Sequence, residues 1–293
     1  MYLQHFRLRE LPFTLTPDTA FFMERAGYLD GLNVLLVALR SGEGFVKVVG
    51  EVGTGKTLLC RRLINALGEE FRCAYLPNPY LSPASLLLSV VEELGIGLPT
   101  PCTQHQLLRR LNAALLQFAA AGTRVVVCLD EAQAVPLQTL EVLRLLTNLE
   151  TEKRKLVQVV LFGQPELDGV LDKPSIRQLR QRISFSYELL PLNRDSVEVY
   201  LAHRLAVAGY EGVRLFNRRA VDVIARGSRG VPRLINILAH KSLMAAYGQG
   251  AGTVERRHAQ LAVDDTADAR IVHTRARGWF GARLSHWLAG HAS

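Results

Sequence analysis

The stretch that decides the fold is Gly50-Glu51-Val52-Gly53-Thr54-Gly55-Lys56-Thr57, which matches Gly-x-x-x-x-Gly-Lys-[Ser/Thr]. An apolar, β-branched run (45–49, FVKVV) comes directly before it, and a run with helical spacing (58–67, LLCRRLINAL) comes directly after it. In this order, backbone N–H groups at a helix N-terminus can surround phosphate oxygens without a Cβ in the way. The stretch therefore predicts a P-loop nucleotide-binding fold.

In such a loop the lysine bridges the β- and γ-phosphates and the last hydroxyl binds Mg²⁺. We assign these roles to Lys56 and Thr57. The residues expected to hold the nucleotide are Gly50, Glu51, Val52, Gly53, Thr54, Gly55, Lys56, Thr57 and Leu58.

A second apolar run (124–130, RVVVCLD) predicts a buried strand that ends in the adjacent carboxylates Asp130 and Glu131. In parallel sheets, ligands bind at the carboxyl ends of the strands. Asp130 suits an outer-shell Mg²⁺ role, and Glu131 suits a general base that orients the attacking water. Alone, the acidic pair could be an ordinary loop start, but beside the P-loop it indicates hydrolysis. Because no Asn-Lys-x-Asp guanine motif is present, the expected nucleotide is ATP, with Mg²⁺.

Further candidates lie at other strand ends and helix starts. Gln164 follows the next apolar run and could sit between the phosphate loop and the acidic strand, or it could be a plain turn residue. Among Arg177, Arg180 and Arg182, one could reach a neighbouring subunit's γ-phosphate, while a solvated basic helix end accounts for at least two of them. Arg233 opens a helix from which it could close over the nucleotide.

Up to Pro191, short apolar runs alternate with stretches of helical spacing. After Pro191 only helical spacing remains. This rhythm predicts an α/β fold, a parallel sheet flanked by helices, followed by a small all-helical lid. The expected strands are 45–49, 71–77, 124–130, 156–162 and 183–190. The expected domains are 1–191 for nucleotide binding, 192–262 for the lid, and 263–293 for a polar linker with an amphipathic C-terminal segment.

The composition limits the class of protein. A hydrophobic content of 48% excludes a disordered chain, and no apolar run approaches the roughly 20 residues of a membrane-spanning helix. The N-terminus has no secretory signal pattern, so we expect a cytoplasmic protein, with a peripheral place at the inner membrane left open. Residues 193–293 hold 15 basic and 8 acidic side chains of a chain with net charge +8. An anionic partner, either nucleic acid or lipid, and a simply solvated basic face both fit this asymmetry.

The C-terminal segment 275–293 carries one apolar helical stripe made of Phe280, Leu284, Trp287 and Leu288, flanked by arginines. It could dock on anionic lipid or in a partner's groove. The alternative is that it packs back on the lid.

Taken together, the motifs resemble the AAA+ ATPases of the ExeA/GspA-like family over roughly residues 1–250. The matching stretches are FRLRELPFTLTPD (6–18), GEVGTGKT (50–57), LDEAQ (129–133), LFGQPEL (161–167), LRQRI (179–183) and GVPRLIN (230–236). The resemblance implies sensor 1 at Gln164, the arginine finger at Arg182 with Arg180 as alternative, sensor 2 at Arg233, and an adenine pocket near Pro12 and Phe13. Phe13, Phe21 and Phe22 fit a hydrophobic core equally well.

The resemblance also implies a role. It is nearest to the family members that serve MSHA pilus biogenesis, and it implies an ATP-dependent homo-oligomer that hydrolyses ATP to help assemble a type IV pilus or secretion apparatus. Its partners would be assembly proteins at the inner membrane. Secretion members continue into a transmembrane and cell-wall-binding part that this sequence lacks, so cell-wall binding is not implied. The alternative is a DNA-dependent AAA+ ATPase of the transposition-regulator type, which fits the basic C-terminal third.

Overall fold

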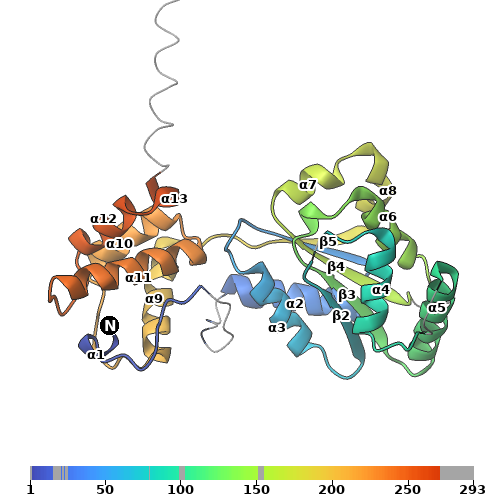
Figure 1. Cartoon of the computed structure of the whole chain (residues 1–293), viewed down its shortest axis with the longest axis horizontal. Helices are drawn as coiled ribbons and strands as arrows, with labels where there is room; N and C mark the ends of the chain where they lie inside the picture. The colour runs from blue at the N-terminus through green and yellow to red at the C-terminus, as the bar shows by residue number, and fades with distance from the viewer. Residues whose placement is uncertain are drawn as a thin grey trace, which may run out of the picture. The chain divides into compact units, whose positions relative to one another are not determined.

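The computed structural model describes residues 2–15, 21, 23, 26–78, 80–98, 103–150 and 155–270. They form two compact units, shown in Figure 1. The first unit spans Glu24–Leu190. The second unit combines the described residues of Met1–Met23 with those from Pro191 onward. Each unit has its own hydrophobic core.

The first unit is built on a five-stranded sheet with the order β2-β3-β4-β1-β5, in which every pair of neighbours is parallel. This confirms the fold class predicted from the alternating apolar runs. The strands are β1 (Phe45–Val49), β2 (Phe71–Leu76), β3 (Arg124–Leu129), β4 (Val157–Gly163) and β5 (Ile183–Glu188). Because β4 lies between β1 and β3, the carboxyl ends of these three strands are neighbours at one edge.

Helices cover both faces of this sheet (Figure 1). Alternate residues of β3, such as Val125 and Val127, join a core with the helices that follow β2 and β3, while Gln158 on β4 points to the opposite face and donates to the carbonyl of Leu39 in α2. The α-helices are α2 (Ala26–Arg40), α3 (Lys56–Ala66), α4 (Pro83–Glu93), α5 (Gln104–Ala120), α6 (Leu137–Leu146), α7 (Glu166–Leu171) and α8 (Arg177–Arg180). Two 3₁₀ turns span Ala132–Ala134 and Pro174–Ile176.

The second unit is helical. Its helices are α1 (Tyr2–His5), α9 (Arg194–Val207), α10 (Arg218–Ser228), α11 (Pro232–Gly248), α12 (Arg256–Asp264) and α13 (Ala267–Arg270). Helices α10, α11 and α12 pack on one another, and α1 packs on α11. Alanines on the facing sides, such as Ala239 and Ala259, are fully buried, which allows these short helices to approach closely.

The N-terminal stretch belongs to the helical unit, which corrects the expected 1–191 domain. The physical reason is a set of contacts with α9 and α11: buried Arg204 donates to the carbonyl of Pro12, and Asn236 donates to the carbonyl of Thr14 at 3.2 Å. The Phe13 ring meets Phe216 edge-on at 5.9 Å between ring centroids. The stretch therefore completes the helical core.

No helix of the described residues is both long and apolar enough to cross a bilayer. The amphipathic segment 275–293 lies outside the described residues.

Candidate nucleotide-binding site

The phosphate-binding loop runs from the end of β1 to the start of α3, and its glycines are required by the space and the backbone around them. Gly53 and Gly55 have φ of 80° and 101°, which side chains disfavour. A Cβ on Gly55 would lie 1.6 Å from the Tyr28 hydroxyl, and one on Gly50 would lie 2.8 Å from the carbonyl oxygen of Leu189. The loop therefore tolerates no side chain at these positions.

Lys56 is 5% exposed and its ammonium group lies inside the loop. Its Nζ donates to the carbonyl oxygens of Gly50 at 2.8 Å and Glu51 at 3.0 Å. Burial lowers the pKa of Lys56, and the nearby carboxylates of Glu131 and Asp130 act in the opposite direction. The site thus holds a cation at the place where phosphates bind.

Thr57 and Asp130 meet where α3 begins and β3 ends. The Thr57 hydroxyl donates to Asp130 Oδ2 at 2.6 Å, and the backbone N–H of Glu131 donates to Oδ1 at 3.0 Å. Burial and the Asp130 carboxylate raise the pKa of neighbouring Tyr75 to about 12, so its hydroxyl stays protonated. A hydroxyl and a carboxylate at one point are oxygen ligands of the kind that Mg²⁺ prefers.

Glu131 is held by two side-chain amides. Its Oε2 accepts from Gln133 Nε2 at 2.7 Å and from Gln164 Nε2 at 2.9 Å, and Gln133 Oε1 accepts from the backbone N–H of Gln164 at 3.0 Å. Burial raises the pKa of Glu131, but the two amides and the charge of Lys56 outweigh it and leave the pKa below its usual value. Glu131 also has φ of 51°, a strained conformation for a residue with a side chain. The carboxylate is therefore ionised and fixed in direction.

The structure thus brings together Lys56, Thr57, Asp130, Glu131 and Gln164, as the strand order requires. Gln164 lies at the end of β4, between the loop that follows β1 and the acids that follow β3. Its catalytic role stays a prediction.

The sequence did not predict three contacts at this site. Gln133 lies in the quoted stretch LDEAQ, but its role as a bracket for Glu131 shows only in the fold. The Tyr28 hydroxyl, on helix α2, donates to the carbonyl of Thr54 at 2.8 Å, although the two residues are 26 positions apart in the sequence. Tyr75 lies near Asp130, with 3.5 Å between its hydroxyl and Oδ2. No local motif indicates these partners.

The arginine candidates have other partners in the first unit. Arg182 is half-buried and donates to the Thr147 hydroxyl at 3.3 Å, while Arg180 pairs with Asp172 at 2.7 Å, where both side chains are largely exposed. Arg177 is exposed. A role of either pairing arginine in a neighbouring subunit stays a prediction.

The remaining candidates belong to the helical unit. Arg233 is exposed in the first turn of α11, so its guanidinium is available for a ligand. Phe13 and Phe21 are each 3% exposed in the core of this unit, which is the alternative that the sequence left open. Phe22 lies outside the described residues. Adenine contact by Pro12, whose ring is buried, stays a prediction.

Comparison with known proteins finds similarity in the first unit and over most of the chain. Residues 39–171 match the family described as AAA domain. The chain is 40% identical over 270 residues to the general secretion pathway protein A of Aeromonas hydrophila, a match that covers 92% of this chain. The chain spans about half of that relative, since the match covers 49% of its length.

Solved structures share the fold. The ORC2 protein of Aeropyrum pernix in its ADP form is 19% identical, with a TM-score of 0.63, over 87% of this chain and 72% of that chain. Cdc6p of Pyrobaculum aerophilum is 20% identical, with a TM-score of 0.62, over 82% of this chain and 68% of that chain. The chain thus has the P-loop AAA+ fold, an α/β unit with a helical unit.

Proposed function

We propose that this protein is an ATP-hydrolysing member of the ExeA/GspA-like AAA+ ATPases. The observation that carries the proposal is the Glu131 carboxylate, bracketed by two amides beside the lysine of a phosphate-binding loop. An ionised carboxylate fixed at this place can accept a proton from water that attacks the γ-phosphate.

Each residue of the site then has a defined role. The backbone N–H groups of the loop and Lys56 bind and orient the phosphates, because they present fixed positive charge to them. The Gln133 and Gln164 amides keep Glu131 aimed and ionised, and Glu131 takes the proton from the attacking water. Gln164, as sensor 1, can also donate toward the water or the γ-phosphate. Arg233, as sensor 2, would bring a cation from the helical unit.

Mg²⁺ fits the oxygen ligands offered by Thr57 and Asp130 at the edge of the loop. The Thr57 hydroxyl oxygen and Asp130 Oδ2 lie 2.6 Å apart. Thr57 would bind the ion directly and Asp130 would hold its outer shell. When bound, the ion supplies neutralisation of charge between the β- and γ-phosphates.

Two substitutions separate binding from hydrolysis. Lys56→Ala should weaken ATP binding more than about tenfold, because a charge-assisted contact to phosphate is lost. Glu131→Gln should bind ATP normally and lose hydrolysis by about a hundredfold or more, because only the base is removed. Binding is measured by titration with a fluorescent ATP analogue and hydrolysis by single-turnover phosphate release. Glu92→Gln, an exposed position on α4, is the matched control. Near-normal turnover in Glu131→Gln would remove the proposed base.

We further propose that this ATPase assists assembly of a type IV pilus of the MSHA kind or of a related secretion apparatus, as a peripheral protein at the cytoplasmic face of the inner membrane. The support is the similarity to a secretion-pathway protein and the resemblance of its motifs. Full-length Glu131→Gln protein, held in its ATP-bound state and tagged in its native cell, should capture inner-membrane proteins of such a machine. Stimulation of hydrolysis by duplex DNA that falls steeply with salt, without such capture, would favour the transposition-regulator class instead.

A further inference from the structure

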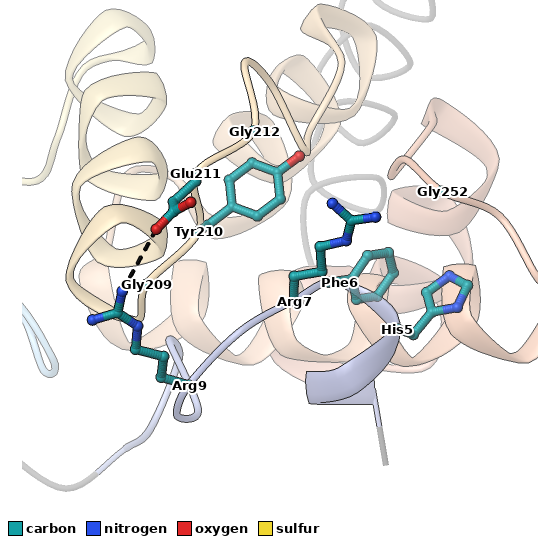
Figure 2. A pocket seen from close by; sticks show the side chains of 9 residues that line it. All are labelled: His5, Phe6, Arg7, Arg9, Gly209, Tyr210, Glu211, Gly212 and Gly252. Atoms are coloured by element: carbon teal, nitrogen blue, oxygen red, sulfur yellow. Dashed lines mark ion pairs between the residues drawn. The ribbon is translucent and has the colours of Figure 1, made fainter.

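The helical unit has a cavity of about 570 Å³ between the N-terminal stretch and the loop that follows α9. Figure 2 shows His5, Arg7 and Arg9 along one side of the cavity, with Tyr210 and Glu211 across from them. Arg233 opens the 17-residue helix α11, while His5 contacts the carbonyl of Ala251 beyond the far end of that helix. A helix of 17 residues is about 25 Å long, so the cavity lies near the end of α11 opposite to Arg233.

The charges around this cavity favour an anionic ligand. Arg9 pairs with Glu211 at 3.5 Å, and the two side chains are 78% and 86% exposed, so the ion pair is weak. A carboxylate of a ligand can therefore replace Glu211 as the partner of Arg9. The Arg7 side chain has no hydrogen-bond or ion-pair partner among the described residues, and it lines the cavity. A guanidinium with no internal partner can bind a carboxylate through two parallel hydrogen bonds.

Arg7 also has a backbone conformation that is energetically unfavourable for a residue with a side chain. Its φ is 55°, and the N–H of Leu8 donates to the carbonyl of Leu3 while that of Arg7 donates to Gln4. These bonds form a Schellman motif at the end of α1, with Arg7 at the left-handed position that usually holds glycine. Glycine would fit this backbone with less strain, so the local fold does not account for the arginine.

A second hollow of about 210 Å³ lies beside the first, and its lining is mainly apolar apart from the ion pair of Glu198 and Arg214. Buried Leu205, Phe216 and Val221 line it, and the two hollows share Tyr210 and Gly212. Val213, at the rim, is fully exposed. A segment that crosses the loop 209–214 can place a carboxylate in the basic hollow and an apolar side chain in the other.

We propose that these two hollows form a docking site for an extended peptide segment of another protein in which acidic and apolar residues alternate. Charge complementarity decides the occupant. Residues 271–293, which follow α13, have three arginines and no acidic residue, so they do not match a basic hollow. Neither hollow is lined by a residue assigned to the nucleotide, and through them the helical unit binds a partner.

The test uses full-length protein and fluorescein-labelled 12-residue peptides in anisotropy titrations. The probes are (Asp-Leu-Glu-Ile)₃, its amide version (Asn-Leu-Gln-Ile)₃, its apolar-free version (Asp-Ser-Glu-Ser)₃ and its basic version (Lys-Leu-Arg-Ile)₃. Only the first should bind, and its affinity should fall as salt is raised. Arg7→Gly should weaken its binding about tenfold or more, because a charge-assisted pair is lost, while the melting temperature stays the same or rises. Val213→Ser should weaken it severalfold.

Arg229→Gly is the matched control, because Arg229 is an exposed arginine with φ of 53° in the same unit that does not line either hollow. It should bind the first peptide like the wild type, and all three variants should hydrolyse ATP at the basal rate. Equal binding by Arg7→Gly, tight binding of the amide or basic peptide, or binding of (Asp-Ser-Glu-Ser)₃ equal to that of the first peptide overturns the proposal. Absence of binding by every peptide up to about 1 mM also overturns it.

Discussion

At the scale of single residues, Gln133 determines how the proposed base is held, because it donates to Glu131 and accepts from the backbone of Gln164. Gln133→Leu removes a hydrogen bond that lowers the pKa of Glu131, so that pKa should rise. A base acts only when ionised, so the acid limb of the kcat profile against pH should move to higher pH. The value of kcat at neutral pH should fall about tenfold to a hundredfold.

The measurement is steady-state hydrolysis between pH 5 and 9, with Gln138→Leu as control. Gln138 is an exposed position on the nearby helix α6. ATP affinity should stay close to that of the wild type, since Gln133 makes no hydrogen bond to a loop residue among the described residues. If the acid limb stays in place while kcat falls, Gln133 does not tune the ionisation of Glu131.

Tyr28 supports the phosphate loop from outside the motif. Its hydroxyl donates to the carbonyl of Thr54, which is fully buried, so Tyr28→Phe leaves that carbonyl without this donor. We expect a loss of about 1 kcal/mol in the free energy of unfolding and a severalfold rise in the Kd for ATP. Urea denaturation and nucleotide titration test this, with exposed Tyr80→Phe as control. Wild-type values in both measurements would show that the hydroxyl does not hold the loop.

These residues mark the limit of prediction at this scale. The glycines, Lys56 and Thr57 are recognisable because phosphate binding requires fixed types at fixed spacing along one stretch of chain. Gln133 and Tyr28 act through single hydrogen bonds to atoms that the fold brings near. A glutamine two residues after a glutamate has many other uses, so its type and spacing are not diagnostic.

At the scale of elements, Gln158 ties the central strand β4 to the helix α2. It is 2% exposed, and its Nε2 donates to the carbonyls of Leu39 at 3.0 Å and Glu43 at 2.8 Å, where α2 ends. Gln158→Leu keeps a side chain of similar volume and removes the hydrogen-bond donor of the carbonyls of Leu39 and Glu43. We expect about 2 kcal/mol of lost stability in urea denaturation, with normal hydrolysis per folded molecule. Gln117→Leu, exposed on α5, should change nothing. Equal stability of the two variants would show that the hydrogen bonds of Gln158 do not stabilise the fold.

The strands were predictable to within two residues at either end, since short apolar, β-branched runs between helical patterns seldom form anything other than buried strands. The place of the N-terminal stretch was not. Its phenylalanines fit any core, and the bonds from Arg204 and Asn236 that fix it come from about 190 to 220 residues further along the chain.

At the scale of the whole molecule, an active site that needs a neighbour's arginine works only at an interface between subunits. Arg182 is the proposed finger, and the Thr147 hydroxyl is its one side-chain hydrogen-bond partner among the described residues. Arg180 is already paired with Asp172. We therefore expect Arg182→Ala to bind ATP normally and to hydrolyse it poorly, while Arg180→Ala, the matched control, stays close to the wild type.

Mixing two inactive variants tests whether the arginine acts across the interface. Arg182→Ala subunits keep Glu131, and Glu131→Gln subunits keep Arg182, so a complete site forms only where the first type binds ATP and the second type supplies the arginine. In a head-to-tail assembly of equal, random composition, about one quarter of the interfaces meet this condition, and hydrolysis should recover to about a quarter of the wild-type rate. Phosphate release is measured for each variant alone and for the mixture, and native mass measurement with a non-hydrolysable ATP analogue confirms that mixed assemblies form. If mixed assemblies form and hydrolysis stays at the level of the separate variants, Arg182 acts within its own subunit or not at all, because a contribution in trans requires recovery.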